Sequence, residues 1–150
     1  MNILVTDGEN KAALAITRSL GRLGHRVIVG EKKTPSLAQA SRYCAARVTY
    51  ADPVTASDAF VDDLVRVARE QQVDVVLPVA DITTFLVTRN RDRLEPCAIP
   101  FASAETIERA ANKVEITQLA QRLDVPVPAT RLLCARQPVQ IGRASCRERV

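Results

Sequence analysis

Aromatic residues make up only 3% of this 150-residue sequence, and tryptophan is absent. A surface that stacks nucleic-acid bases needs aromatic side chains, so we expect no such platform. The net charge is a modest +4 without a basic stripe, which gives no support to nucleic-acid binding. No apolar run approaches the ~20 residues of a membrane span. The first residues lack a basic region followed by a long apolar one, so we also expect no signal peptide.

The residue types of several common sites are missing as well. The single histidine, His25, begins a predicted strand at the wrong end of a sheet for a Ser-His-Asp triad. Only Gly8 is present of the spaced glycines that a dinucleotide-binding turn needs, and there is no P-loop motif. No C-x-x-C pair occurs, which argues against zinc and favours reduced thiols in a cytoplasmic protein. The four cysteines are Cys44, Cys97, Cys134 and Cys146.

The last ten residues differ in character from the rest. Segment 141–150 has no apolar period and carries three arginines within seven residues. It resembles the translation of a common sequencing-library adapter, and the frame agrees because Gln140 can be encoded by CAG. We therefore expect an artefactual tail and leave it out of the fold. Without it 18 basic and 16 acidic residues remain, a net charge of +2, and we expect the natural protein to continue past residue 140.

Short apolar runs alternate with helical periodicity up to about residue 102. Residues 3–5 and 27–29 are continuous apolar runs, as in strands buried on both faces. A helical stripe lies between them, at Ala13, Ile16, Leu20 and Leu23, with Gly24 placed as its C-cap. Further strands are expected at 47–50, 73–77 (central) and 98–101 (edge). Further helices are expected at 35–41, up to Val67 with Thr55 as the N-cap, and from Asp81. This pattern predicts an α/β fold, a Rossmann-like open and mostly parallel sheet over residues 1–102.

Ligands of open α/β sheets bind at the carboxyl ends of the strands. The loop after the first strand therefore supplies the first substrate-binding candidates, Asp7, Gly8, Glu9 and Asn10. Asp81, the expected N-cap of the helix after strand 73–77, is a further candidate at this edge. Glu31 follows the second strand, but without the fingerprint glycines a solvated charge is the simpler interpretation.

A helical connector and the start of another domain are expected over residues 103–140. Ser103 is placed to cap a short helix, and Asn112 with Glu115 has the pattern of a capping box that begins a second one. Lys113 then takes the first helical position, where a cation opposes the helix dipole by roughly 0.3–1 kcal/mol. A bound phosphate would reverse the sign of this effect, because helix N-termini attract anions.

Several segments resemble a known family. Residues 111–115 (Ala-Asn-Lys-Val-Glu), 119–120 and 123–128 (Leu-Asp-Val-Pro-Val-Pro) are similar to a junction in ATP-grasp enzymes. In that junction an Asp-Lys pair opens a helix that ends in a Gly-Val-Pro-x-Pro-like segment. Segments 5–10, 41–44 and 75–79 resemble the carbamoyl-phosphate-synthase-like subgroup, the carboxylate–amine ligases. The sequence departs from the family pattern at Asn112, where Asp is usual, and at Asp124, where Gly is usual.

The resemblance implies that residues 1–102 are a pre-ATP-grasp domain and that 103–140 are a connector and the start of a truncated ATP-grasp domain. It implies a parent enzyme that uses ATP and Mg²⁺ to activate a small-molecule carboxylate as an acyl phosphate, which an amine then attacks. Lys113 is implied to reach the ATP phosphates. The family's magnesium ligands and main ATP clamp lie beyond this chain, so we expect the fragment alone to be inactive and to contain no metal or catalytic residues.

Two other functions remain as alternatives. A non-catalytic Rossmann-like nucleotide- or ligand-binding domain would share the same sheet and would differ only in lacking turnover. A receiver-type signalling module would use an ordered set of acidic, phospho-acceptor, hydroxyl and lysine residues, here Asp7, Asp52, Thr83 and Lys113. The receiver lysine ends a strand, whereas Lys113 is expected to begin a helix. No nucleic-acid or membrane partner is expected, and the oligomeric state is open.

Overall fold

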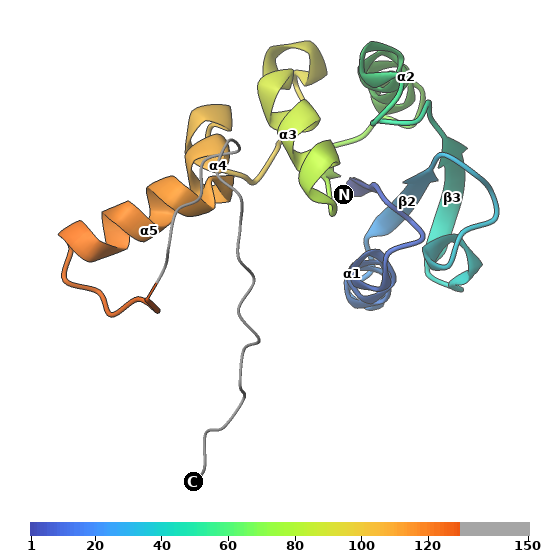
Figure 1. The fold of residues 1–150 in the computed structure, drawn as a ribbon. Helices are drawn as coiled ribbons and strands as arrows, with labels where there is room; N and C mark the ends of the chain where they lie inside the picture. Colours follow the sequence, from blue (N-terminus) through green and yellow to red (C-terminus); the bar gives the residue numbers. More distant parts are fainter. Residues whose placement is uncertain (130–150) are drawn as a thin grey trace, which may run out of the picture. The chain divides into compact units, whose positions relative to one another are not determined.

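The computed structural model describes residues 1–129, which divide into two compact units, Met1–Glu108 and a second that begins at Arg109. The first unit is built on a four-stranded parallel sheet in the order β3-β2-β1-β4 (Figure 1). Its strands are β1 (Asn2–Val5), β2 (Arg26–Glu31), β3 (Cys44–Thr49) and β4 (Val75–Leu77). This sheet confirms the predicted Rossmann-like α/β fold. The predictions for residues 130–140, within the expected start of another domain, and for the tail 141–150 lie outside the described residues.

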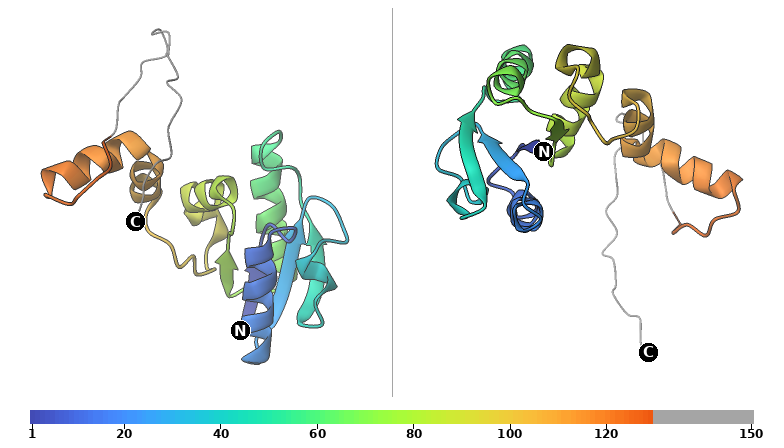
Figure 2. Two further views of the ribbon diagram at one scale, coloured as in Figure 1. Left: turned by 60° about the horizontal axis from the view of Figure 1, so that its bottom comes forward. Right: turned by 180° about the vertical axis from the view of Figure 1, so that it is seen from behind.

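Two hydrophobic clusters cover the two faces of the sheet, because alternate strand residues point to opposite sides. On one face, Ile3 and Val27 pack with Ala13 of α1 (Lys11–Arg22). On the other face, Leu4 packs with Phe60 of α2 (Ser57–Glu70), and α3 (Asp81–Arg89) contributes to the same cluster. Figure 2 shows the sheet lying between α1 and α2. The core is therefore complete within the first unit.

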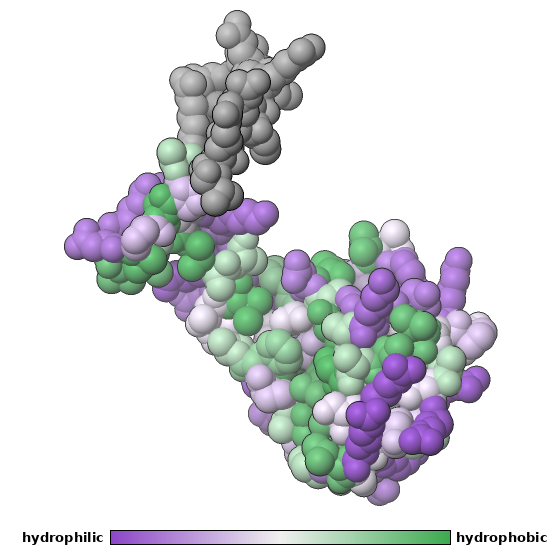
Figure 3. Space-filling view, turned by 90° about the horizontal axis from the view of Figure 1, so that it is seen from below, coloured by the Kyte–Doolittle hydropathy of each residue, from purple (hydrophilic) through white to green (hydrophobic). Residues whose placement is uncertain are grey.

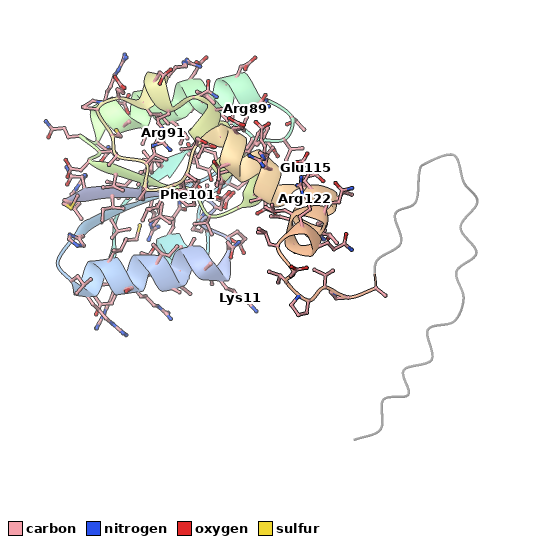
Figure 4. All side chains as sticks on the ribbon, turned by 90° about the vertical axis from the view of Figure 1, so that its left-hand side faces the viewer. Lys11, Arg89, Arg91, Phe101, Glu115 and Arg122 are labelled. Atoms are coloured by element: carbon pink, nitrogen blue, oxygen red, sulfur yellow. The ribbon has the colours of Figure 1, made fainter. Side chains whose placement is uncertain are left out.

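The predicted last strand at 98–101 is reduced to one bridge. Val75 of β4 pairs with Ala98, whose carbonyl accepts the N–H of Val76 at 2.9 Å. The ladder goes no further along this segment, where Pro100 lacks the N–H that a longer one would use. Strand β4 still has partners on both sides, as the prediction of a central strand required. The segment after the bridge is held by Arg91 of the short helix η2 (Arg91–Leu94), which donates to the carbonyl of Phe101 at 2.9 Å (Figure 4).

The helix ends differ in detail from the sequence predictions. Gly24 has a φ of +82°, which confirms it as the C-cap glycine of α1. Leu23, however, is 71% exposed, and the buried positions of α1 are Ala13 and Thr17. The prediction that Thr55 and Asp81 are N-caps was wrong, since the N-cap positions of α2 and α3 are alanines, without a side-chain cap bond.

The remaining helices are η1 (Ala38–Ala40), α4 (Ala104–Ala111) and α5 (Lys113–Arg122). The Ser103 hydroxyl accepts the N–H of Thr106 at 3.3 Å, which confirms Ser103 as a cap of α4. Helices α4 and α5 contain no buried residue. None of the helices within residues 1–129 is long and apolar enough to cross a membrane.

Candidate functional site

The Asp7 carboxylate joins the carboxyl ends of β1 and β4. Its Oδ2 accepts hydrogen bonds from the N–H groups of Val79 (3.1 Å) and Ala80 (2.9 Å) and from the hydroxyl of Thr83 (2.6 Å). Asp7 thereby binds the two amides that precede α3 and a hydroxyl of its first turn, so its charge lies near the helix N-terminus, where the helix dipole favours it. Its own φ is +58°, a left-handed conformation that Asp tolerates better than most residues. Asp81 is not the N-cap that the sequence predicted: it is exposed at the first helical position, and the N-cap residue is Ala80.

The other residues of this loop have structural partners. A Cβ on Gly8 would lie 2.4 Å from Ser36 Oγ and 2.9 Å from a methyl carbon of Val29, so only glycine fits there. Asn10 is the N-cap of α1, because its Oδ1 accepts the N–H of Ala12 at 2.9 Å. Glu9 is exposed, and one of its oxygens accepts the N–H of Leu37 at 3.2 Å. The loop is therefore held on every side by the first unit's own backbone and side chains.

Glu31 takes part in the same arrangement instead of being only a solvated charge. Its two carboxylate oxygens accept the N–H groups of Glu9 at 2.9 Å and Lys32 at 2.8 Å. Beside it, Lys32 and Asp52 form an exposed ion pair at 2.9 Å. The hydrogen bond and charge of Lys32 hold the pKa of Asp52 below its usual value. Asp52 is thus engaged with a lysine of the neighbouring loop, and Lys113 begins helix α5, whereas the lysine of a receiver ends a strand.

Tyr50, which the sequence analysis did not single out, fixes the end of β3 to this site. Its hydroxyl accepts the N–H of Asp7 at 2.8 Å and donates to the carbonyl of Gly30 at 3.2 Å. The ring is buried against Phe60, with centroids 4.9 Å apart in an edge-to-face arrangement. This burial raises the pKa of Tyr50 well above its ordinary value, so the phenol keeps its proton. The only sequence signal was a tyrosine as the last residue of the predicted strand 47–50, and the observed β3 ends one residue before it.

The second unit contains the predicted lysine. Asn112 is the N-cap of α5, since its Oδ1 accepts the N–H groups of Val114 (3.1 Å) and Glu115 (3.4 Å). Its side-chain amide donates to Glu115 at 2.9 Å, which completes the predicted capping interaction in a variant form. Lys113 stands exposed at the first helical position. Because Asn112 already occupies first-turn amides, the Lys113 ammonium is what this helix end offers to an anion. Glu115 and Arg122 mark the helix in Figure 4.

Residues 1–129 contain no cluster of acidic and thiol side chains that could form a metal site. No group of three or more His, Cys, Asp or Glu side chains in this part of the chain is arranged to hold a metal ion. Cys44 and Cys97 are free thiols, and partial burial raises the pKa of both. The described residues therefore provide the Asp7–Asn10 loop with its polar neighbours at the carboxyl edge of the sheet, and an exposed lysine. They provide no metal centre.

No family model and no curated protein matches the chain. Solved structures do match it, and each of the three described next covers 85% of the chain. An L-amino acid ligase from Bacillus licheniformis matches with a TM-score of 0.68 at 17% identity, over 31% of its own length. The biotin carboxylase domain of a single-chain bacterial carboxylase matches with a TM-score of 0.63 at 21% identity, over 30% of its own length. N5-carboxyaminoimidazole ribonucleotide synthetase from Thermotoga maritima matches with a TM-score of 0.55 at 18% identity, over 32% of its own length.

The matched proteins share one architecture. They are ATP-grasp enzymes with an N-terminal pre-ATP-grasp domain, and the chain spans just under a third of each. Identities near 20% carry the fold and not the substrate. The chain therefore has the fold of the pre-ATP-grasp domain, the fold that its sequence motifs resemble.

Proposed function

We propose that this chain is the N-terminal part of a longer, cytoplasmic ATP- and Mg²⁺-dependent ligase of the carbamoyl-phosphate-synthase-like subgroup. The observation that carries the proposal is the fold shared with an L-amino acid ligase over 85% of this chain but only 31% of that enzyme. We assign residues 1–102 to the pre-ATP-grasp domain and 103–140 to the connector and the start of the ATP-grasp domain. Segment 141–150 is assigned to the foreign tail.

The proposed reaction joins a carboxylate to an amine in two steps. A carboxylate oxygen attacks the γ-phosphorus of ATP, and ADP leaves, which forms an acyl phosphate. The amine nitrogen then attacks the acyl carbon, phosphate leaves, and the nitrogen loses a proton. Mg²⁺, when bound with ATP, would supply positive charge that offsets the negative charge developing on the phosphates. The described residues offer no cluster for this ion, so its ligands are assigned to the rest of the enzyme.

The residues of the carboxyl edge are given different tasks. Asp7, Gly8 and Asn10 have their bonding or packing inside the fold, so they position the loop. Glu9 and Asp81 are exposed at the same edge, so they are the groups proposed to meet the substrate. Their negative charges suit a protonated amine and do not suit a carboxylate. In the second unit, the Lys113 ammonium is assigned to the ATP phosphates, as a point charge on a flexible stem.

The test requires the longer gene. A sequencing read across codon 140 of the genomic locus recovers it, and ADP release is then measured with panels of carboxylates and amines. We expect turnover that needs both substrates, and we expect Lys113→Gln to raise the KM for ATP about tenfold, a loss equivalent to one charged hydrogen bond. Arg122→Gln, at the other end of α5, is the matched control and should leave that KM unchanged.

Two outcomes would contradict the proposal. A full-length product that binds ATP without ever turning it over would support the non-catalytic binding domain. Measurable ATP turnover by the 150-residue chain alone would contradict the assignment of the catalytic machinery to the missing part.

A further inference from the structure

Three arginines surround a hollow at the amino edge of the sheet. The hollow measures about 400 Å³ and is lined by Arg18 and Arg22 of α1 and by residues 40–43 before β3. Because the parallel strands begin at this edge, it lies at the opposite end of the sheet from the Asp7–Asn10 loop. Figure 3 looks onto the face that α1 covers and shows strongly hydrophilic side chains projecting from it. We call Arg18, Arg22 and Arg42 the arginine cluster.

The arginine cluster lacks the partners that other arginines of the first unit have. Arg66, Arg89 and Arg93 each form an ion pair with a carboxylate. Within residues 1–129, no ion pair is formed by a member of the arginine cluster. Arg18 and Arg22 also stand four positions apart on one helix, a spacing at which like charges repel. An anion in the hollow would relieve this repulsion.

Tyr43 contacts both α1 and Arg42 of the arginine cluster. Its ring packs directly on Gly21 of α1, where an added Cβ would lie only 2.5 Å from the tyrosine Cβ. This contact explains why α1 carries a glycine near its end, although glycine weakens helices. The Tyr43 hydroxyl accepts a hydrogen bond from Arg42 at 2.8 Å, and the guanidinium lies 4.8 Å from the ring centre. Hydrogen bonds from Arg42 and Arg22, with a smaller contribution from their charges, lower the pKa of Tyr43.

We propose that the arginine cluster binds a small molecule bearing a phosphate or pyrophosphate group, at a site separate from the proposed ligase site. Guanidinium groups pair with phosphate oxygens through two parallel hydrogen bonds, which makes arginine the preferred residue for this recognition. A hollow of about 400 Å³ is larger than a single phosphate ion and is in the size range of small-ligand pockets. Ser41 adds a hydroxyl to the lining.

Titration calorimetry on the 150-residue chain tests this site with three probes, inorganic pyrophosphate, glucose 6-phosphate and ADP, at constant ionic strength. We expect binding of at least one probe, and we expect Arg22→Gln/Arg42→Gln to weaken it at least tenfold. Arg66→Gln/Arg69→Gln on α2 removes the same charge elsewhere and should leave the affinity within twofold. Comparing the probes separates a nucleotide from a sugar phosphate or a bare pyrophosphate as the source of the group.

A second variant and a second readout guard against misfolding. Arg22→Lys/Arg42→Lys keeps the charge but loses the paired donors, so its affinity should fall between those of the parent and the glutamine variant. The best probe should raise the Tm of the parent and not that of the glutamine variant, since a ligand stabilises only a state that binds it. Equal weakening in the two double glutamine variants, or no binding of any probe, would overturn the proposal.

Discussion

Asp7 shows how a side chain that is distant in the sequence can bond to the groups at the start of a helix. Its carboxylate satisfies two backbone N–H groups and a hydroxyl at the start of α3, more than 70 residues along the chain. We expect Asp7→Asn to lower the free energy of unfolding by about 1.5–3 kcal/mol, because a charged acceptor is lost while the donors remain. Urea unfolding measures this value. Asp81→Asn is the control and should cost less than about 1 kcal/mol, so equal losses would contradict the assigned role.

Tyr50 predicts a pH dependence of stability on the alkaline side. Burial raises its pKa in the folded state above the unfolded value of about 10, so the folded state keeps the proton longer. The stability contributed by the neutral phenol is therefore fully present below about pH 10 and falls as the pH rises further. Tyr50→Phe should flatten this alkaline loss in urea unfolding measured between about pH 8 and 11.

Tyr43→Phe is the matched control for that series. The pKa of Tyr43 is lowered by Arg42 and Arg22, so its contribution has the opposite sign and favours the folded state as the pH rises. The Tyr43 variant should therefore keep the alkaline loss. A Tyr50 variant with an unchanged profile would show that other groups cause it.

At the scale of the elements, the sequence predicted what depends on local pattern. Continuous apolar runs located β1, β2 and β4, and the Gly24 C-cap and the Asn112 cap were correct. The errors included the starts of α2 and α3, where the predicted caps Thr55 and Asp81 are not used, and the strand at 98–101, which is a single bridge. The partners of Asp7 and the role of Tyr50 depend on strand order, which periodicity does not contain. The arginine cluster could not be predicted for the same reason, because it combines residues of α1 with a residue of the segment before β3.

Helix α1 carries a testable exception to helix propensity. In an exposed helix, Gly→Ala stabilises by about 1 kcal/mol. At Gly21 the new methyl group would overlap Tyr43, so we expect Gly21→Ala to destabilise the chain in urea unfolding. In a Tyr43→Ala background the same substitution should become neutral or stabilising. This double-mutant cycle isolates the contact, and additive effects would contradict the proposed packing.

At the scale of the whole molecule, the two units differ in how many apolar side chains they bury. The first unit has a core on both faces of its sheet, whereas α5 has no buried residue. On one side of this helix Ile116 is 44% exposed, and the C-cap residue Leu123, which follows on the same side, is 65% exposed. An isolated helix of ten residues is marginal in water. In the proposed longer ligase, the rest of the ATP-grasp domain would cover this apolar side.

Hydrogen exchange followed by mass spectrometry distinguishes these states. In the 150-residue chain, we expect the amides of α5 to exchange at least a hundredfold faster than those of β1, because only local opening is needed. In the full-length product, the α5 amides should become protected while those of β1 change little. Protection of α5 equal to that of β1 in the short chain would mean that the second unit is stable by itself. The exposed apolar side would then need an explanation other than a missing domain.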